Sequence, residues 1–251
     1  PHTFETIETI EARPAWNAFR AQLTETQTLA WDMTELWLAG ANVTVTVGDL
    51  LLIVAPNGSG YDASIRRVTE VESSREADRA RVFLATISTS AGSVSASKPG
   101  VYVMRSTVSP FGHNAPLQPQ YSSGVFQGTF SEWALDGAEL DSLLTLSSRN
   151  DKILDNSFVV IEQDDPDSGS RMWTFATVTA VTHRSVARYG LAGNGTRLSL
   201  STGWTKHADS KLDLLRTMTV AAQSEEIALA ERPLSYPVYG ETLSLEQLVE
   251  G

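Results

Sequence analysis

The sequence has no cysteine, and this absence removes three kinds of chemistry at once. A chain without cysteine cannot build a disulfide framework, a thiolate zinc site or a cysteine nucleophile. Long apolar runs are also missing. No run approaches the ~18 residues of a membrane-spanning helix, and no charged-then-apolar leader indicates secretion. We therefore expect neither a transmembrane segment nor a signal peptide.

Positive charge is scarce. The 251 residues include 19 Lys and Arg against 30 Asp and Glu, a net charge of -11. Such a surface disfavours a phosphate backbone or an anionic membrane as partner. The hydrophobic content of 41% is typical of a chain that buries a core. The composition predicts a folded protein that contacts no nucleic acid and does not insert into membranes.

The usual catalytic and cofactor motifs are missing as well. The four histidines form no HxH or HExxH pattern, there is no GxSxG elbow, and no Gly-rich phosphate loop precedes a helix. These absences predict no catalytic residues, no metal, no cofactor and no enzymatic activity. A Ser-His-Asp site assembled only in space stays open at this point, since such residues need not be neighbours in sequence.

One acidic stretch resembles the start of a calcium loop. In EQDDPDSGS, Asp165, Asp167 and Gly169 have suitable spacing, but no glutamate closes the loop at the required distance. The same residues are typical of a hairpin tip, and we prefer that interpretation.

Strand patterns dominate beyond the N-terminal region. RPAWNAFRAQL places Trp16, Phe19, Arg20 and Leu23 at helical spacing, which predicts one short helix. The later segments are short, rich in β-branched and aromatic residues, and bounded by Gly, Pro, Ser or Asn. NGSG is expected to be a hairpin turn, ESSREADRAR a solvated hairpin, and THRSVARYGLAGNGTR a longer loop whose Tyr189 and Leu191 fold onto the core.

The strand pattern occurs twice. Five features of residues 36–105 return in the same order, at offsets of 108 to 116 residues, in residues 144–216. The matched features are Leu36 with Leu144, Leu51 with Val159, Val68–Val71 with Val178–Val181, Arg81–Leu84 with Arg197–Leu200, and Arg105 with Arg216. Ordered matches with small changes at loops indicate a duplicated β unit with one strand order. Strict alternation would place Val68 with Glu70 on one face and Thr69 with Val71 on the other.

These patterns predict a mainly β fold of two tandem, similar antiparallel barrel or sandwich units after a short helical segment. The expected divisions are an N-terminal arm with the helix (1–34), a first β unit (35–108), a connector (109–142), a second β unit (143–221) and a C-terminal extension (222–251).

The stretch SPFGHNAPLQP lies where the first unit ends. Gly112 can adopt a positive φ, and Asn114 can bond nearby amides, both of which are typical of a turn. Phe111, Gly112, His113 and Asn114 are therefore expected to form a structural corner, since nothing nearby in sequence gives His113 a catalytic partner.

Several motifs in order resemble one family. TFETIETIEARPAWNAF, VYVMRSTVSPFGHNAP, ILDNSFVVIE, YGLAGNGTRLSL and AAQSEEIALAERPL are similar to landmarks in the central region of baseplate assembly proteins of phage-tail-like contractile injection systems. The resemblance implies a wedge-type structural component, assembled in the cytoplasm into a phage-tail-like particle. Its partners would be other wedge, hub or sheath-platform subunits. Asn156-Ser157-Phe158 departs from the Gly-Ser-Trp type of turn expected there.

Two other functions remain open. Six tryptophans allow a carbohydrate-binding β module on the particle surface, because exposed indoles stack on sugar faces. Trp37 and Trp173 lie in apolar strands, however, where a core or interface role is more common. The third possibility is a cell-wall hydrolase.

Overall fold

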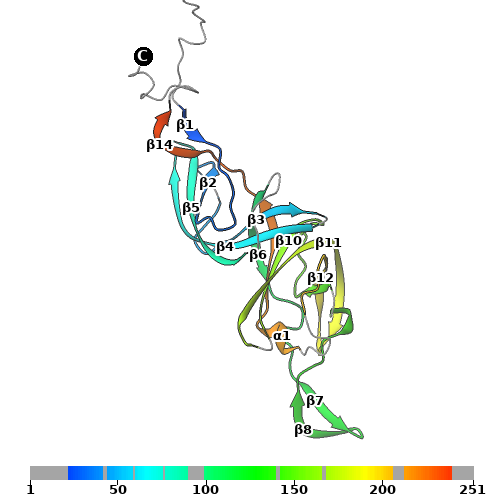
Figure 1. Cartoon of the computed structure of the whole chain (residues 1–251). Coiled ribbons are helices and arrows are strands. Elements are labelled where there is room, and N and C mark those ends of the chain that lie inside the picture. Colours follow the sequence, from blue (N-terminus) through cyan, green and yellow to red (C-terminus); the bar gives the residue numbers. More distant parts are fainter. Residues whose placement is uncertain are drawn as a thin grey trace, which may run out of the picture.

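A computed structural model describes residues 22–41, 44–58, 60–75, 77–89, 99–139, 142–165, 168–205 and 212–238. Within them the chain is mainly β (Figure 1). The strands are β1 (Gln22–Glu25), β2 (Glu35–Ala39), β3 (Leu50–Asn57), β4 (Gly60–Ser74), β5 (Arg79–Thr89), β6 (Gly100–Val108), β7 (Gln118–Ser122), β8 (Val125–Ser131), β9 (Leu143–Leu146), β10 (Phe158–Asp164), β11 (Arg171–Arg188), β12 (Leu191–Leu200), β13 (Thr219–Glu226) and β14 (Arg232–Val238). The helical elements are the 3₁₀ turn η2 (Gly137–Glu139) and helix α1 (Asp213–Arg216).

Ten of these strands form one antiparallel sheet in the order β2-β5-β4-β3-β6-β13-β10-β11-β12-β9. The expected mainly β, antiparallel fold is confirmed, and the two predicted units share this one sheet because β6 pairs with β13. The predicted shared strand order is confirmed. The first half reads β2-β5-β4-β3-β6, and the second reads β9-β12-β11-β10-β13, which is the same sequence of equivalent strands.

Strand registers confirm four of the five sequence matches. Val68 pairs with Leu84, and their predicted equivalents Val178 and Leu200 pair likewise. Both pairs are followed by the same register shift, a bulge that opposes two residues to one. The bulge overturns the strict alternation expected after Val68. Val71, like Val68, packs against the core.

The fifth match, Arg105 with Arg216, is wrong. Leu52 pairs with Tyr102 between β3 and β6, whereas its equivalent Val160 pairs with Ala221 between β10 and β13. The last strands are thus related by 119 residues, from Tyr102 to Ala221. Arg105 lies in β6, but Arg216 lies in α1, which precedes β13. The predicted match failed because the segment containing α1 lengthens the second copy.

The first strand of each half forms a β-bridge with the segment that follows the last strand of the other half. Leu38 in β2 bridges Leu229, beyond β13, and the N–H of Ala39 donates to the Ala228 carbonyl at 2.9 Å. In the equivalent place, Leu146 in β9 bridges Pro110, beyond β6, and the Ser147 N–H donates to Ser109 at 2.9 Å. These bridges partly cover the two outermost strands of the sheet.

The sheet is curled around three apolar cores. One lies inside each half, and the third lies between outward faces of the two halves. Alternation along β3 sends Leu51 and Ile53 to the first core and Leu52 and Val54 to the third. Such strands are buried on both faces, which explains the uninterrupted apolar run in the sequence.

Several local predictions can be checked. NGSG and ESSREADRAR connect paired strands, as predicted. The loop predicted at 182–197 is wrong, because β11 and β12 extend through it as a hairpin, although Tyr189 and Leu191 do pack against the second core. Leu23 lies in β1 and not in a helix, while Trp16, Phe19 and Arg20 fall outside the described residues. The predicted connector, 109–142, contains β7, β8 and η2. The predicted end of the second unit, residue 221, lies inside β13.

The shared β6–β13 pairing predicts that the two halves unfold together. Leu36 and Leu144 are equivalent and at most 1% exposed, so Leu36→Ala and Leu144→Ala should each cost about 3 kcal/mol. Urea unfolding followed by tryptophan fluorescence and by circular dichroism should show one coincident transition for both variants. Two transitions, with each variant shifting a different one, would contradict this.

Candidate interaction surface

The predicted corner leads the chain from β6 into the second half. The Phe111 N–H donates to the Thr145 carbonyl at 2.7 Å, which ties the corner to β9. Gly112 has a φ of +98°, the left-handed region expected from the sequence. A Cβ at this position would lie 2.8 Å from the Tyr189 ring. Glycine is therefore required both by the turn and by the close approach.

His113 is bonded within this turn. Its Nδ1 lies 2.9 Å from the Pro110 carbonyl, to which a protonated Nδ1 donates, and Asn114 is exposed. His183 instead lies near Thr196 and Asp151, while His2 and His207 fall outside the described residues. The imidazole of His113 thus has a structural contact with its own turn.

Beyond the corner, ionic and polar contacts fix both ends of the segment 115–133. Arg216 donates to both carboxylate oxygens of Glu132, at 3.0 and 2.9 Å, and to the Ala115 carbonyl at 2.9 Å. The indole N–H of Trp133 donates to the Pro116 carbonyl at 2.7 Å. A bidentate arginine contact is directional, so the two ends are held in a defined orientation.

A buried ion pair lies behind this attachment. The Glu139 carboxylate is 5% exposed and accepts from Arg188 at 2.6 Å and from the Thr145 N–H at 2.9 Å. Burial alone would lower the pKa of Arg188, but hydrogen bonds and the charge of Glu139 raise it overall. Burial also raises the pKa of the Tyr189 phenol, whose oxygen accepts from the Asp136 N–H at 2.9 Å. These interactions fix the chain just beyond the segment.

Between its fixed ends, the segment forms a hairpin of β7 and β8 that projects from the end of the molecule at which α1 lies (Figure 1). Ser123 and Gly124 both have positive φ, 49° and 78°, as a two-residue type I′ turn requires. We call residues 117–131 the hairpin arm.

One face of the hairpin arm is aromatic and exposed. Tyr121, Phe126 and Phe130 are 64%, 44% and 59% exposed, with ring centroids 5.8 and 5.4 Å apart along the series. Leu117 and Val125 are also exposed, so five of the nine large exposed apolar side chains among the described residues lie here. The arm contains no charged residue. An apolar patch of this kind is typical of a protein contact site.

This arm lies within the connector predicted from the sequence. Its alternating pattern, QYS and VFQGTFS around Ser123-Gly124, is a hairpin signal that the high glycine and serine content obscured. Asp165 and Gly169 lie in the β10–β11 hairpin loop, where the Gly169 N–H donates to the Asp165 carbonyl, and Asp167 is outside the described residues. Among the residues described, no group of three or more His, Asp or Glu side chains could hold a metal.

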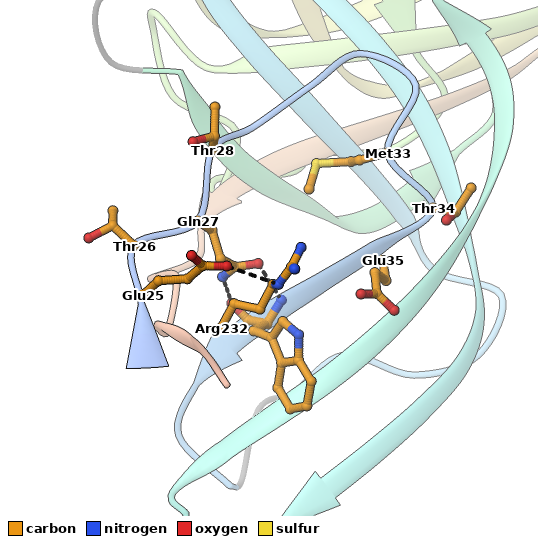
Figure 2. Close-up of a pocket in the computed structure, with 9 residues that line it drawn as sticks. Glu25, Thr26, Gln27, Thr28, Met33, Thr34, Glu35 and Arg232 are labelled. Carbon is orange, nitrogen blue, oxygen red and sulfur yellow. Dashed lines mark hydrogen bonds and ion pairs between the residues drawn. The ribbon is translucent and has the colours of Figure 1, made fainter. Parts of the chain in front are cut away.

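A polar pocket of about 400 Å³ lies beside β1 and β2 (Figure 2). Glu25 and Arg232 form an ion pair at 3.3 Å, and the Gln27 side chain bonds both the N–H and the carbonyl of Trp37. Glu35 is paired with Arg81. These contacts join strands together, so Glu25, Gln27, Glu35 and Arg232 have structural partners.

Comparison of the chain with protein-family models, curated proteins and solved structures gave no match. In the described part of the chain, no helix combines the length and apolarity needed to cross a bilayer.

The geometry at Gly112 predicts a steric effect separable from its backbone effect. Gly112→Ala should destabilise the protein by about 3 kcal/mol, because strain at positive φ adds to overpacking against Tyr189. Gly124→Ala is the matched control, since its φ is +78° with nothing within 4 Å of the new Cβ. It should cost about 1 kcal/mol. Equal losses in urea unfolding would contradict the predicted contact.

Proposed function

We propose that this chain is a non-enzymatic structural module of a contractile injection system or phage-tail-like baseplate. It contributes to wedge assembly through contacts with other wedge, hub or sheath-platform subunits. The hairpin arm is the observation that carries this proposal. The assignment to a baseplate is supported by the ordered sequence landmarks, and assembly would take place in the cytoplasm.

The hairpin arm has the properties of a docking element. A two-stranded ribbon alone is marginally stable in water, so its exposed rings favour a partner that covers them. Its base is held by the Arg216–Glu132 contact, which reduces the ordering cost of binding. The arm is uncharged on a chain of net charge -11, so it can approach another acidic subunit with little local repulsion.

In this proposal the two halves act as the tandem barrel units predicted from the sequence. The bridges from β2 to Leu229 and from β9 to Pro110 support that interpretation, because they bring the chain back to the first strand of each half. Two joined units would form a rigid body that carries the arm.

A carbohydrate-binding module on the particle surface is the second candidate. Tyr121, Phe126 and Phe130 favour it as well, since exposed aromatic rings stack on sugars. Binding on a glycan array that is lost when the three rings are removed would support this function over subunit assembly.

Removing two rings of the arm should weaken assembly without unfolding the protein. In co-expression with the other baseplate subunits, Phe126→Ser/Phe130→Ser should weaken incorporation by about 30-fold or more, as expected when interface anchors worth about 2 kcal/mol are lost. Leu154→Ser is the control, because Leu154 is 65% exposed but lies outside the arm. Unchanged incorporation of the double variant, measured by particle purification and immunoblotting, would refute the role of the arm.

A further inference from the structure

The third core has two ends that the internal repeat makes equivalent, and only one of them is filled. At the filled end, the Phe158 ring packs edge-on against Tyr61 and Tyr102, with centroids 5.2 and 4.9 Å apart. The Phe175 ring lies 5.4 Å from Phe158 on another side. Four aromatic rings thus close this end.

The opposite end carries smaller or charged side chains at the equivalent positions. Leu50 takes the place of Phe158, at the offset of 108, and Ala221 takes the place of Tyr102, at 119. Arg171, paired with Asp164, takes the place of Tyr61, paired with Pro56. Arg171 is held by Glu162 and Asp164 at 2.8 and 2.7 Å. The rings that close the first end therefore have no aromatic counterpart here.

A cavity of about 320 Å³ occupies this second end. Its apolar walls are Leu50, Met104, Val160, Trp173 and Ala221, and its polar rim includes Asp49, Arg67, Thr107, Glu162 and Thr219. We call it the Leu50 cleft. Met104, Val160 and Ala221 are at most 7% exposed, so the floor is built from buried side chains. Its volume is at the low end of the range for small-ligand sites, which leaves room for an aromatic side chain.

The filled end shows what such a space accommodates. Tyr102 lies over Gly100, because a Cβ added to Gly100 would be 2.9 Å from the Tyr102 ring. The residue equivalent to Gly100 is Thr219, whose hydroxyl donates to Glu162 at 3.3 Å. In the second copy both the ring and the glycine beneath it are replaced, so the chain cannot close the Leu50 cleft in the same way.

We propose that the Leu50 cleft receives a phenylalanine or tyrosine side chain from another protein subunit, in the position that Phe158 and Tyr102 occupy at the other end. The cleft is an acceptor site, whereas the hairpin arm is a donor of exposed rings. The inference goes beyond the proposed function, and the probe titration that tests it leaves the arm unchanged.

The test is a titration of the full chain, with labelled methyl groups, by N-acetyl-phenylalaninamide and N-acetyl-tyrosinamide. The NMR signals of Leu50, Met104, Val160 and Ala221 should shift in a saturable way, and N-acetyl-alaninamide should shift none of them. Absence of these shifts up to the solubility limit of the aromatic probes would overturn the proposal.

Thr219→Gly/Ala221→Tyr copies the Gly100–Tyr102 arrangement into the cleft and should weaken probe binding at least tenfold. Thr219→Gly alone is the control and should retain binding. Leu50→Phe narrows the cleft from the opposite wall and provides a second test should the double variant fail to fold. Unweakened binding in a folded double variant, or in Leu50→Phe, would overturn the assignment. Without any probe, the same methyl signals could also shift as the protein concentration rises. If those shifts vanish in Phe126→Ser, the ring in the cleft comes from a second copy of this chain, and the proposal of a different subunit is overturned.

Discussion

The antiparallel pairing of β6 with β13 is the constraint on which the rest of the structure depends. Each strand is the last of its own half, and each continues into the other half, where it bridges the first strand. The first strand of each half is bridged by the segment that follows the last strand of the other half. Since unpaired edge groups are a liability in water, this exchange stabilises both halves together and limits the edges available for nonspecific pairing.

Internal matching extends to backbone hydrogen bonds within each half. The Val68 N–H donates to Asp49 and the Val178 N–H to Ser157, at equivalent positions. Gly48 and Asn156, which precede these acceptors, both have positive φ, and asparagine tolerates that region better than most residues. The Asn-Ser-Phe sequence, which departs from the expected turn, therefore forms the same local structure as Gly-Asp-Leu in the first half.

Sequence reasoning succeeded where burial leaves a periodic record. Leu51 and Val159, or Val82 and Leu198, could be matched because a core position tolerates few residue types, so two equivalent strands remain similar. Matching failed at Arg105 and Arg216, because an inserted segment with α1 displaces the last strand without changing its pairing. The single sheet could not be predicted, since β6–β13 pairing depends on backbone groups that carry no side-chain pattern.

The candidate sites were harder to foresee for a related reason. The corner was predictable because Gly112 and Pro110 are local signals, but the Tyr189 ring that fills its space comes from a distant hairpin. The hairpin arm falls in the predicted connector, and no local signal shows that its aromatic side chains are exposed. The Leu50 cleft is open because Ala221 has no aromatic ring, whereas its equivalent Tyr102 has one. These two residues are matched only by the structural offset of 119, and the offset of 111 inferred from Arg105 and Arg216 does not align them.

Differences between the two halves are therefore more informative about function than their similarities. Positions that close the sheet are matched in both halves, as folding requires. The hairpin arm follows the first half, and the open cleft lies at one of the two ends of the third core. The fold already accommodates aromatic rings at the other end of the third core, around Phe158, so a ring in the cleft would require no new arrangement of the sheet. A cavity with an apolar floor that the fold could have closed, and an exposed aromatic arm held by a bidentate ion pair, each leave apolar surface uncompensated in the isolated chain. Both features favour contacts with other subunits as the state in which that surface is buried.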